Sequence, residues 1–133
     1  MATGRATGRA TGRATSAEQQ TIDVLTAAIE RIASPDRWTQ GAPARDRHGL
    51  FVEVNHPRAA RWNGWGAIEL AMPPRGQGRP GLFTRICCLL DDAARRHFDR
   101  TFNEVNADGT HPQLLEVLQE ALDEAEFRRQ FAE

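Results

Sequence analysis

Hydrophobic residues recur at the spacing of an α-helix through most of the chain, and this pattern predicts about four helices around one core. The expected helices begin at Ser16, at about Pro57, at about Leu82 and at Thr110. Ser16 and Thr110 each stand three residues before a glutamine, which is typical of a capping box at a helix start. The first helix is expected to end at Ser34-Pro35 and the second near Met72.

The helical period is lost between the first and second helices. Glycine and proline interrupt residues 37–55, and Asp46-Arg47-His48-Gly49 has the composition of a turn. The strand-like run 50–54 follows, and we expect it to pair back on residues 38–45 as an irregular hairpin. The predicted fold class is therefore mainly α, with about four helices around one core and a small irregular β-hairpin between helices 1 and 2.

The first fifteen residues differ in composition from the rest of the chain. They form a tandem Ala-Thr-Gly-Arg repeat with three arginines and no acid, and we expect this tail to be disordered. A repeat expansion without a role is favoured over a basic arm that contacts phosphate, which three charges would support only weakly. Residues 16–133 carry 14 arginines against 18 acids and are predicted to form a single globular domain. This mildly acidic balance does not favour nucleic acid as a partner.

The apolar stretches and the cysteines favour a cytoplasmic location. The longest wholly apolar run, 86–90, is too short to span a bilayer, so no membrane association is expected. The two cysteines, Cys87 and Cys88, are adjacent on a predicted helix and cannot readily bridge each other. We expect two buried structural thiols in the third helix, 82–98, with Phe83 also inward, and a cytoplasmic protein.

The sequence contains no pattern typical of a cofactor, a metal site or a catalytic nucleophile. No two of its four histidines are spaced as on a zinc-binding helix, and the glycine-rich loop 73–81 lacks a P-loop lysine. We therefore predict no cofactor, no metal and no catalytic residue. Two polar pairs, Arg45–Asp46 and Asn103–Glu104, remain candidates for a polar site, although turn and capping roles are the favoured explanation of Asp46 and Glu104.

Three stretches, RWTQGAPARDRHG, RWNGWGAI and FNEVNADGTHPQLLEVL, together resemble an uncharacterised family of small bacterial and phage-encoded domains. Its pattern is roughly W-x-x-G-x-x-x-R-D-x-x-G, then W-C-x-x-G-A-L, then W-N-D followed by T-x-x-x-V. The matching positions are Trp38, Gly41, Arg45, Asp46, Gly49, Trp62, Gly66, Ala67, Asn103 and Thr110. The resemblance covers most of residues 20–125 and implies no activity.

The chain departs from that pattern at Asn63, where the family usually has cysteine, and at Glu104, where it usually has aspartate. If the family cysteine were a nucleophile, this chain would be inactive, because an amide cannot replace a thiolate. If the position instead needs a small semi-polar side chain, Asn63 fits. We interpret its amide as bonding a hairpin carbonyl and tying the hairpin to the second helix, beside Gly64 and Ala67.

Two functional hypotheses follow. In the first, the protein is a small non-enzymatic interaction or accessory module, encoded by a phage or mobile element. It would bind an unidentified protein partner, or itself, through an exposed aromatic edge formed by Trp62, Trp65 and Glu69. The open alternative is that both tryptophans pack under the hairpin. In the alternative, an enzyme or small-ligand binder has a polar site between the hairpin and the helices. That polar site would use Arg45, Asp46, Asn103 and Glu104. For the two hypotheses together, the candidate residues are Trp38, Arg45, Asp46, Trp62, Asn63, Trp65, Asn103 and Glu104.

Overall fold

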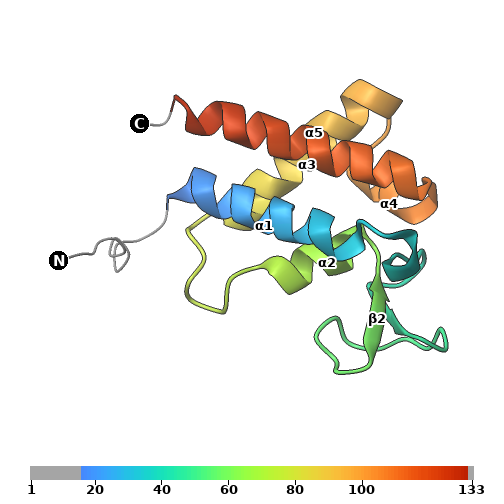
Figure 1. The fold of residues 1–133 in the computed structure, drawn as a ribbon. Coiled ribbons are helices and arrows are strands. Elements are labelled where there is room, and N and C mark those ends of the chain that lie inside the picture. Colours follow the sequence, from blue (N-terminus) through green and yellow to red (C-terminus); the bar gives the residue numbers. More distant parts are fainter. Residues whose placement is uncertain (1–15, 132–133) are drawn as a thin grey trace.

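The computed structural model describes residues 16–131 and shows five α-helices, with a two-stranded antiparallel sheet between the first two (Figure 1). The elements are α1 (Ala17–Ile32), the 3-10 helix η1 (Pro35–Arg37), β1 (Ala44–Asp46), β2 (Ala59–Trp62), α2 (Gly64–Ala71), α3 (Leu82–Phe98), α4 (Phe102–Asp108) and α5 (His111–Arg129). The predicted mainly α fold class is confirmed. The predicted repeat tail, residues 1–15, lies outside the described residues.

The helices enclose one hydrophobic core. α1 packs along both α2 and α5, and α3 packs on α5 and α4, while the strands extend from one end of the helical layer (Figure 1). The largest fully buried side chains come from all five helices and include Leu25, Ile68, Ile86, Phe102 and Leu118. Burying each such side chain contributes roughly 1.5–3 kcal/mol. No helix among residues 16–131 is long and apolar enough to cross a membrane.

The second helix begins at Gly64 rather than near Pro57. Asn63 has an extended backbone, and its side-chain oxygen accepts a hydrogen bond from the Gly66 N–H at 2.7 Å, which fixes the helix start. The residues before this cap, 59–62, form β2. The predicted start is therefore wrong, because strand pairing and the cap override a helical period made largely of small residues.

The hairpin uses a different second strand from the predicted one. β1 pairs with β2, with a shift of register between Arg45 and Asp46. The predicted strand 50–54 contributes a single antiparallel bridge, between Arg45 and Phe51, on the other side of β1. The hairpin between helices 1 and 2 is thus confirmed, but its sheet has the order β1-β2 with residues near Phe51 at the outer edge.

The short helix α4 occupies the link before α5, where we expected an irregular segment. Its start is a complete capping box, in which Thr101 Oγ1 accepts from the Glu104 N–H at 3.1 Å and Glu104 Oε1 accepts from the Thr101 N–H at 2.8 Å. Phe102 and Val105, each 1% exposed, attach the helix to the core. The Thr-x-x-Glu signature is visible in the sequence, but seven residues are too few for a helical period to appear.

The third helix is rotated slightly from the predicted orientation. Leu82 and Leu89 are buried, whereas Phe83 is 51% exposed. Cys87 is only half-buried and Cys88 is exposed, so the prediction of two buried structural thiols is wrong. Partial burial raises the pKa of the Cys87 thiol, which keeps that group protonated near neutral pH.

Candidate functional site

The candidate site lies in the hairpin lobe, by which we mean residues 38–62. Asp46 organises the turn at its tip. The carboxylate is 7% exposed, and its Oδ1 accepts hydrogen bonds from the His48 N–H at 2.8 Å and the Leu50 N–H at 2.9 Å. The bond from Leu50, more than any other contact, lowers the pKa of Asp46, although burial opposes the shift. An ionised, hydrogen-bonded carboxylate is a poor general base and a good structural acceptor.

Arg45 closes the same turn from the other side. Its Nη1 donates to the Gly49 carbonyl at 2.8 Å, and its Nη2 donates to the Gln40 carbonyl at 3.4 Å. The guanidinium lies 4.6 Å from the centre of the Phe51 ring, within the range of a cation–π contact. Gly49 has a φ of +87°, a conformation that favours glycine. Arg45 and Asp46 therefore hold the turn in one conformation.

Two of the predicted tryptophans fasten the lobe to the helical layer. Trp62 is 6% exposed, and its Nε1 donates to the Val54 carbonyl at 2.9 Å. Trp38 forms a parallel bridge with Trp62 and lies 5.3 Å from the ring of His111 at the start of α5. Because Trp62 is buried in the core, it is not part of an exposed aromatic edge.

Asn63 connects the lobe to α2, as predicted, but by a different bond. Its backbone N–H, rather than its side chain, donates to the Pro43 carbonyl at 3.2 Å. The side-chain oxygen instead caps α2 through Gly66. The sequence interpretation placed the correct residue at this junction and assigned its hydrogen bonds wrongly, because it placed Asn63 inside a helix rather than at its cap.

Trp65 and Asn103 meet at the junction of α2 and α4. The Trp65 Nε1 donates to Asn103 Oδ1 at 2.6 Å, and the indole contacts the ring of Phe102 edge to face at 4.9 Å. The ring of Phe83, which is 51% exposed, lies 5.7 Å from that of Trp65. Trp65 is therefore half-buried between helices and keeps only part of the exposed edge that the sequence suggested.

The predicted polar residues make their hydrogen bonds in separate places. Those of Arg45 and Asp46 remain within the tip of the hairpin lobe. Asn103 accepts a hydrogen bond from the Trp65 indole, and Glu104 accepts one from the Thr101 N–H in the capping box of α4. These contacts do not bring the four side chains to one common group.

One residue at the junction of α2 and α4 was missed by sequence reasoning. Asn106 in α4 is 8% exposed, and its Oδ1 accepts from the Gly64 N–H at 2.7 Å, satisfying a donor in the first turn of α2. A Cβ on Gly64 would lie 2.8 Å from that same oxygen, so the contact requires glycine. With α4 unpredicted, nothing in the sequence placed Asn106 beside Gly64.

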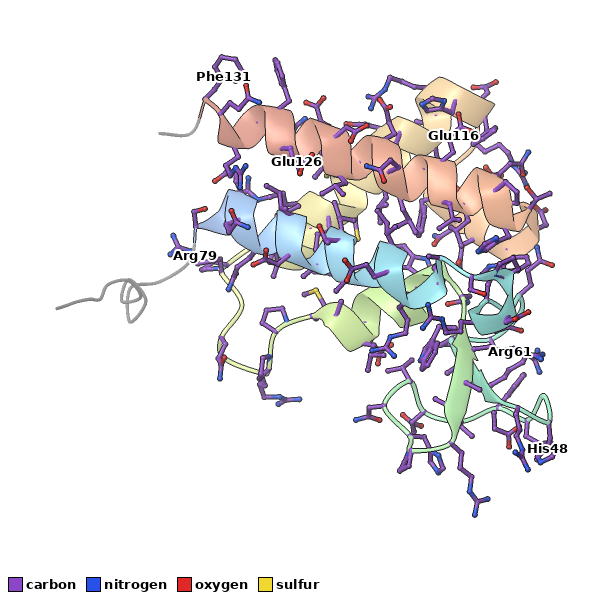
Figure 2. All side chains as sticks on the ribbon, viewed as in Figure 1. His48, Arg61, Arg79, Glu116, Glu126 and Phe131 are labelled. Carbon is purple, nitrogen blue, oxygen red and sulfur yellow. The ribbon has the colours of Figure 1, made fainter. Side chains whose placement is uncertain are left out.

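A surface hollow of about 500 Å³ lies beside Asp46. Its walls are the turn residues 46–48 on one side and residues 57–60 on the other. A smaller groove of about 210 Å³ lies along Phe51 and residues 42–44. Figure 2 shows His48 and Arg61 projecting from this lobe, away from the helical layer. Within residues 16–131, no group of three or more His, Cys, Asp or Glu side chains is arranged to hold a metal ion.

The fold and the site define a small, mainly helical domain with a hydrogen-bonded hairpin lobe at one end. Residues 16–124 match the model of DUF6197, a family of unknown function, and the chain belongs to that family. This match confirms the resemblance to an uncharacterised domain family. No curated protein and no solved structure is significantly similar to the chain.

Proposed function

We propose that this protein is a small interaction module, of bacterial or phage origin and acting in the cytoplasm, that contacts a protein partner through its hairpin lobe. The observation that carries the proposal is the exposure of two adjacent large hydrophobic side chains at the tip of the lobe. Leu50 is 65% exposed and Phe51 is 71% exposed. Phe51 also lines the groove along residues 42–44, and exposed apolar groups beside a groove are typical of contact surfaces.

The rigidity of the tip supports this assignment. Asp46, Arg45 and Gly49 connect both sides of the turn through side-chain and backbone hydrogen bonds. A loop held in one conformation loses little conformational entropy on binding, so more of the contact energy remains as affinity. Leu50 and Phe51 are thereby presented in a fixed geometry without being buried themselves.

The alternative of an enzyme or small-ligand binder has one supporting observation, the hollow beside Asp46. The lowered pKa of Asp46 argues against a general base in that hollow, because an efficient base has a pKa close to the working pH. The contact surface at Leu50 and Phe51 therefore explains the lobe better than a reaction does.

The proposal is tested by placing a photoreactive phenylalanine analogue at position 51 and, in a second protein, at position 127. Phe127 is the matched control, because it is 55% exposed and lies on α5. In cells that express the full chain, irradiation is expected to produce a discrete cross-linked protein from position 51 and not from position 127. Identical products from both positions, or none from position 51, would overturn the proposal.

The double substitution L50S/F51S gives an independent readout. It should abolish the association of the cross-linked protein with an otherwise wild-type chain, while F127S/F131S leaves it unchanged. Circular dichroism of each variant establishes that the helices remain folded. Association that survives L50S/F51S in the folded protein would show that the surface lies elsewhere.

A further inference from the structure

The hollow beside the tip of the hairpin lobe has walls that carry positive charge. Arg47 stands on the wall formed by residues 46–48, and Arg58 on the opposite wall, 57–60. Both side chains are exposed. In the described part of the chain, neither guanidinium forms an ion pair with a carboxylate, in contrast to Arg85, Arg96, Arg100 and Arg128.

The hairpin lobe carries a net positive charge, whereas the whole chain has a net charge of −1. Residues 38–62 contain four arginines and two acids, whereas α5 contains five acids and two arginines. Figure 2 shows His48 and Arg61 on the lobe, with Glu116 and Glu126 along α5 in a separate part of the molecule. Such a separation attracts an acidic surface to the lobe and repels it from α5.

The sheet itself places like charges together. Arg45 and Arg61 are directly opposed in the register of β1 and β2. Like charges at opposed positions destabilise an antiparallel pair. Arg45 is held by backbone carbonyls, while Arg61 extends into solvent. Arg61 therefore adds a solvent-exposed positive charge to the lobe.

Two features of the lobe favour carboxylates of a protein over nucleic acid. The guanidinium of Arg45 lies over the ring of Phe51, which reduces the area of this exposed ring that is free for base stacking. The ionised Asp46 lines the hollow and interrupts its positive potential. A phosphate backbone needs a continuous basic track, whereas separate carboxylate side chains can each meet Arg47 or Arg58.

We infer that the hollow binds carboxylate side chains of an acidic segment of the partner protein, an inference that rests on the proposed function. Arg47 and Arg58 hold these carboxylates, and Leu50 and Phe51 contact neighbouring apolar residues of the same segment. The lobe thus combines an apolar contact with a charge-selective one, which determines which partners it accepts.

The test uses an oligoglutamate peptide as the probe and the full chain labelled with ¹⁵N. We expect the peptide to shift the backbone amide resonances of residues 46–48 and 58–60. The substitution R47Q/R58Q should weaken binding by about tenfold, as expected for the loss of two exposed charge contacts. The matched control R75Q/R79Q removes the same charge from the exposed loop between α2 and α3 and should leave the affinity within about twofold.

Equal weakening by both double variants would overturn the inference, because binding would then depend on net charge alone. The absence of shifts at 46–48, or tighter binding of inorganic phosphate or oligothymidylate than of oligoglutamate, would also overturn it. The experiments distinguish a failure of the proposed function from a failure of this inference. If photocross-linking at position 51 succeeds and oligoglutamate does not bind, the contact surface stands and the acidic partner is wrong. If oligoglutamate binds and position 51 yields no product, the hollow stands without the contact surface.

Discussion

A Cβ atom on Gly66 would lie 1.8 Å from the carbonyl oxygen of Pro43. The first turn of α2 is therefore in direct backbone contact with the segment that leads into β1. The same carbonyl accepts the backbone N–H of Asn63 at 3.2 Å. One backbone oxygen thus meets both the cap of α2 and a glycine whose missing side chain allows the approach, and this junction positions the hairpin lobe on the helices.

The substitution G66A should destabilise the protein by about 2–3 kcal/mol, because the backbone of Pro43 cannot move aside without displacing the lobe. Urea unfolding followed by circular dichroism measures the loss. Gly78 provides the control, since a Cβ there would lie 3.5 Å from Pro73 Cγ, an ordinary contact. G78A should stay within about 0.5 kcal/mol of wild type. An unchanged urea midpoint for G66A would contradict the close approach.

The cap of α2 gives a second prediction. N63A removes the acceptor that receives the Gly66 N–H and should cost about 1 kcal/mol of unfolding free energy. N63D keeps an acceptor oxygen at the same place and should retain most of the stability. If N63D is as destabilised as N63A in urea unfolding, the side chain stabilises the protein by some contact other than the cap.

The fold class could be predicted from the sequence because the long helices depend on local signals. The cap at Ser16 and the capping box of Thr110 with Gln113 are both present in the structure. The errors occur where long-range contacts decide. Residues 59–62 pair with β1 and therefore form a strand, although their spacing fits the helix that follows.

From the sequence, the candidate site could be predicted only as a set of residue positions, without the contacts between them. The sequence singles out Asp46 beside a predicted turn and Asn63 on an apolar face, and both residues are buried in the structure. Their bonding could not be predicted, because it depends on where α2 begins and on an extra helix that supplies Asn106. The exposure of Phe51 could not be predicted either. A strand-like run predicts partial burial, but it does not show whether the segment lies at the outer edge of the sheet.

The contact between Trp65 and Asn103 should couple α2 to α4 energetically. A double-mutant cycle with W65F and N103A is expected to give an interaction energy of about 0.5–1.5 kcal/mol, the usual net value of a side-chain hydrogen bond. Urea unfolding of the four proteins measures it. Strict additivity of the two single effects would mean that the hydrogen bond from the indole N–H to Asn103 adds no stability beyond a hydrogen bond to water.

The turn at the tip of the hairpin lobe should depend on pH through Asp46. Its hydrogen bonds lower the folded-state pKa below the unfolded value, so the stabilisation is complete above the ordinary aspartate pKa. It is lost as the pH falls through the lowered folded pKa. The protection factors of the His48 and Leu50 amides, obtained by NMR after correcting the exchange rates for the intrinsic rate at each pH, should therefore fall on acidification. In D46N, which keeps an acceptor without the charge, this fall should disappear, whereas D46A should show lower protection at every pH.

The junction of α3 with α5 should also weaken in acid, because Glu120 accepts hydrogen bonds from His97 and Arg96. The Arg96 Nη2 lies 3.0 Å from Glu120 Oε2, and the His97 Nε2 lies 3.3 Å from Glu120 Oε1. The contact with His97, followed by that with Arg96, lowers the pKa of Glu120. The contribution to stability is thus present above the ordinary glutamate pKa and declines as the pH falls through the lowered folded value.

The substitution E120Q should therefore destabilise the protein at pH 7 by less than about 1 kcal/mol, since the side chain is 34% exposed and solvent screens its charge. The difference from wild type should shrink in high salt and as the pH approaches 3. Glu126 is the control, because it lies on the exposed face of the same helix and forms no ion pair within residues 16–131. If E126Q and E120Q lose equal stability in urea unfolding, the effect arises from the net charge of α5 and not from the contacts with α3.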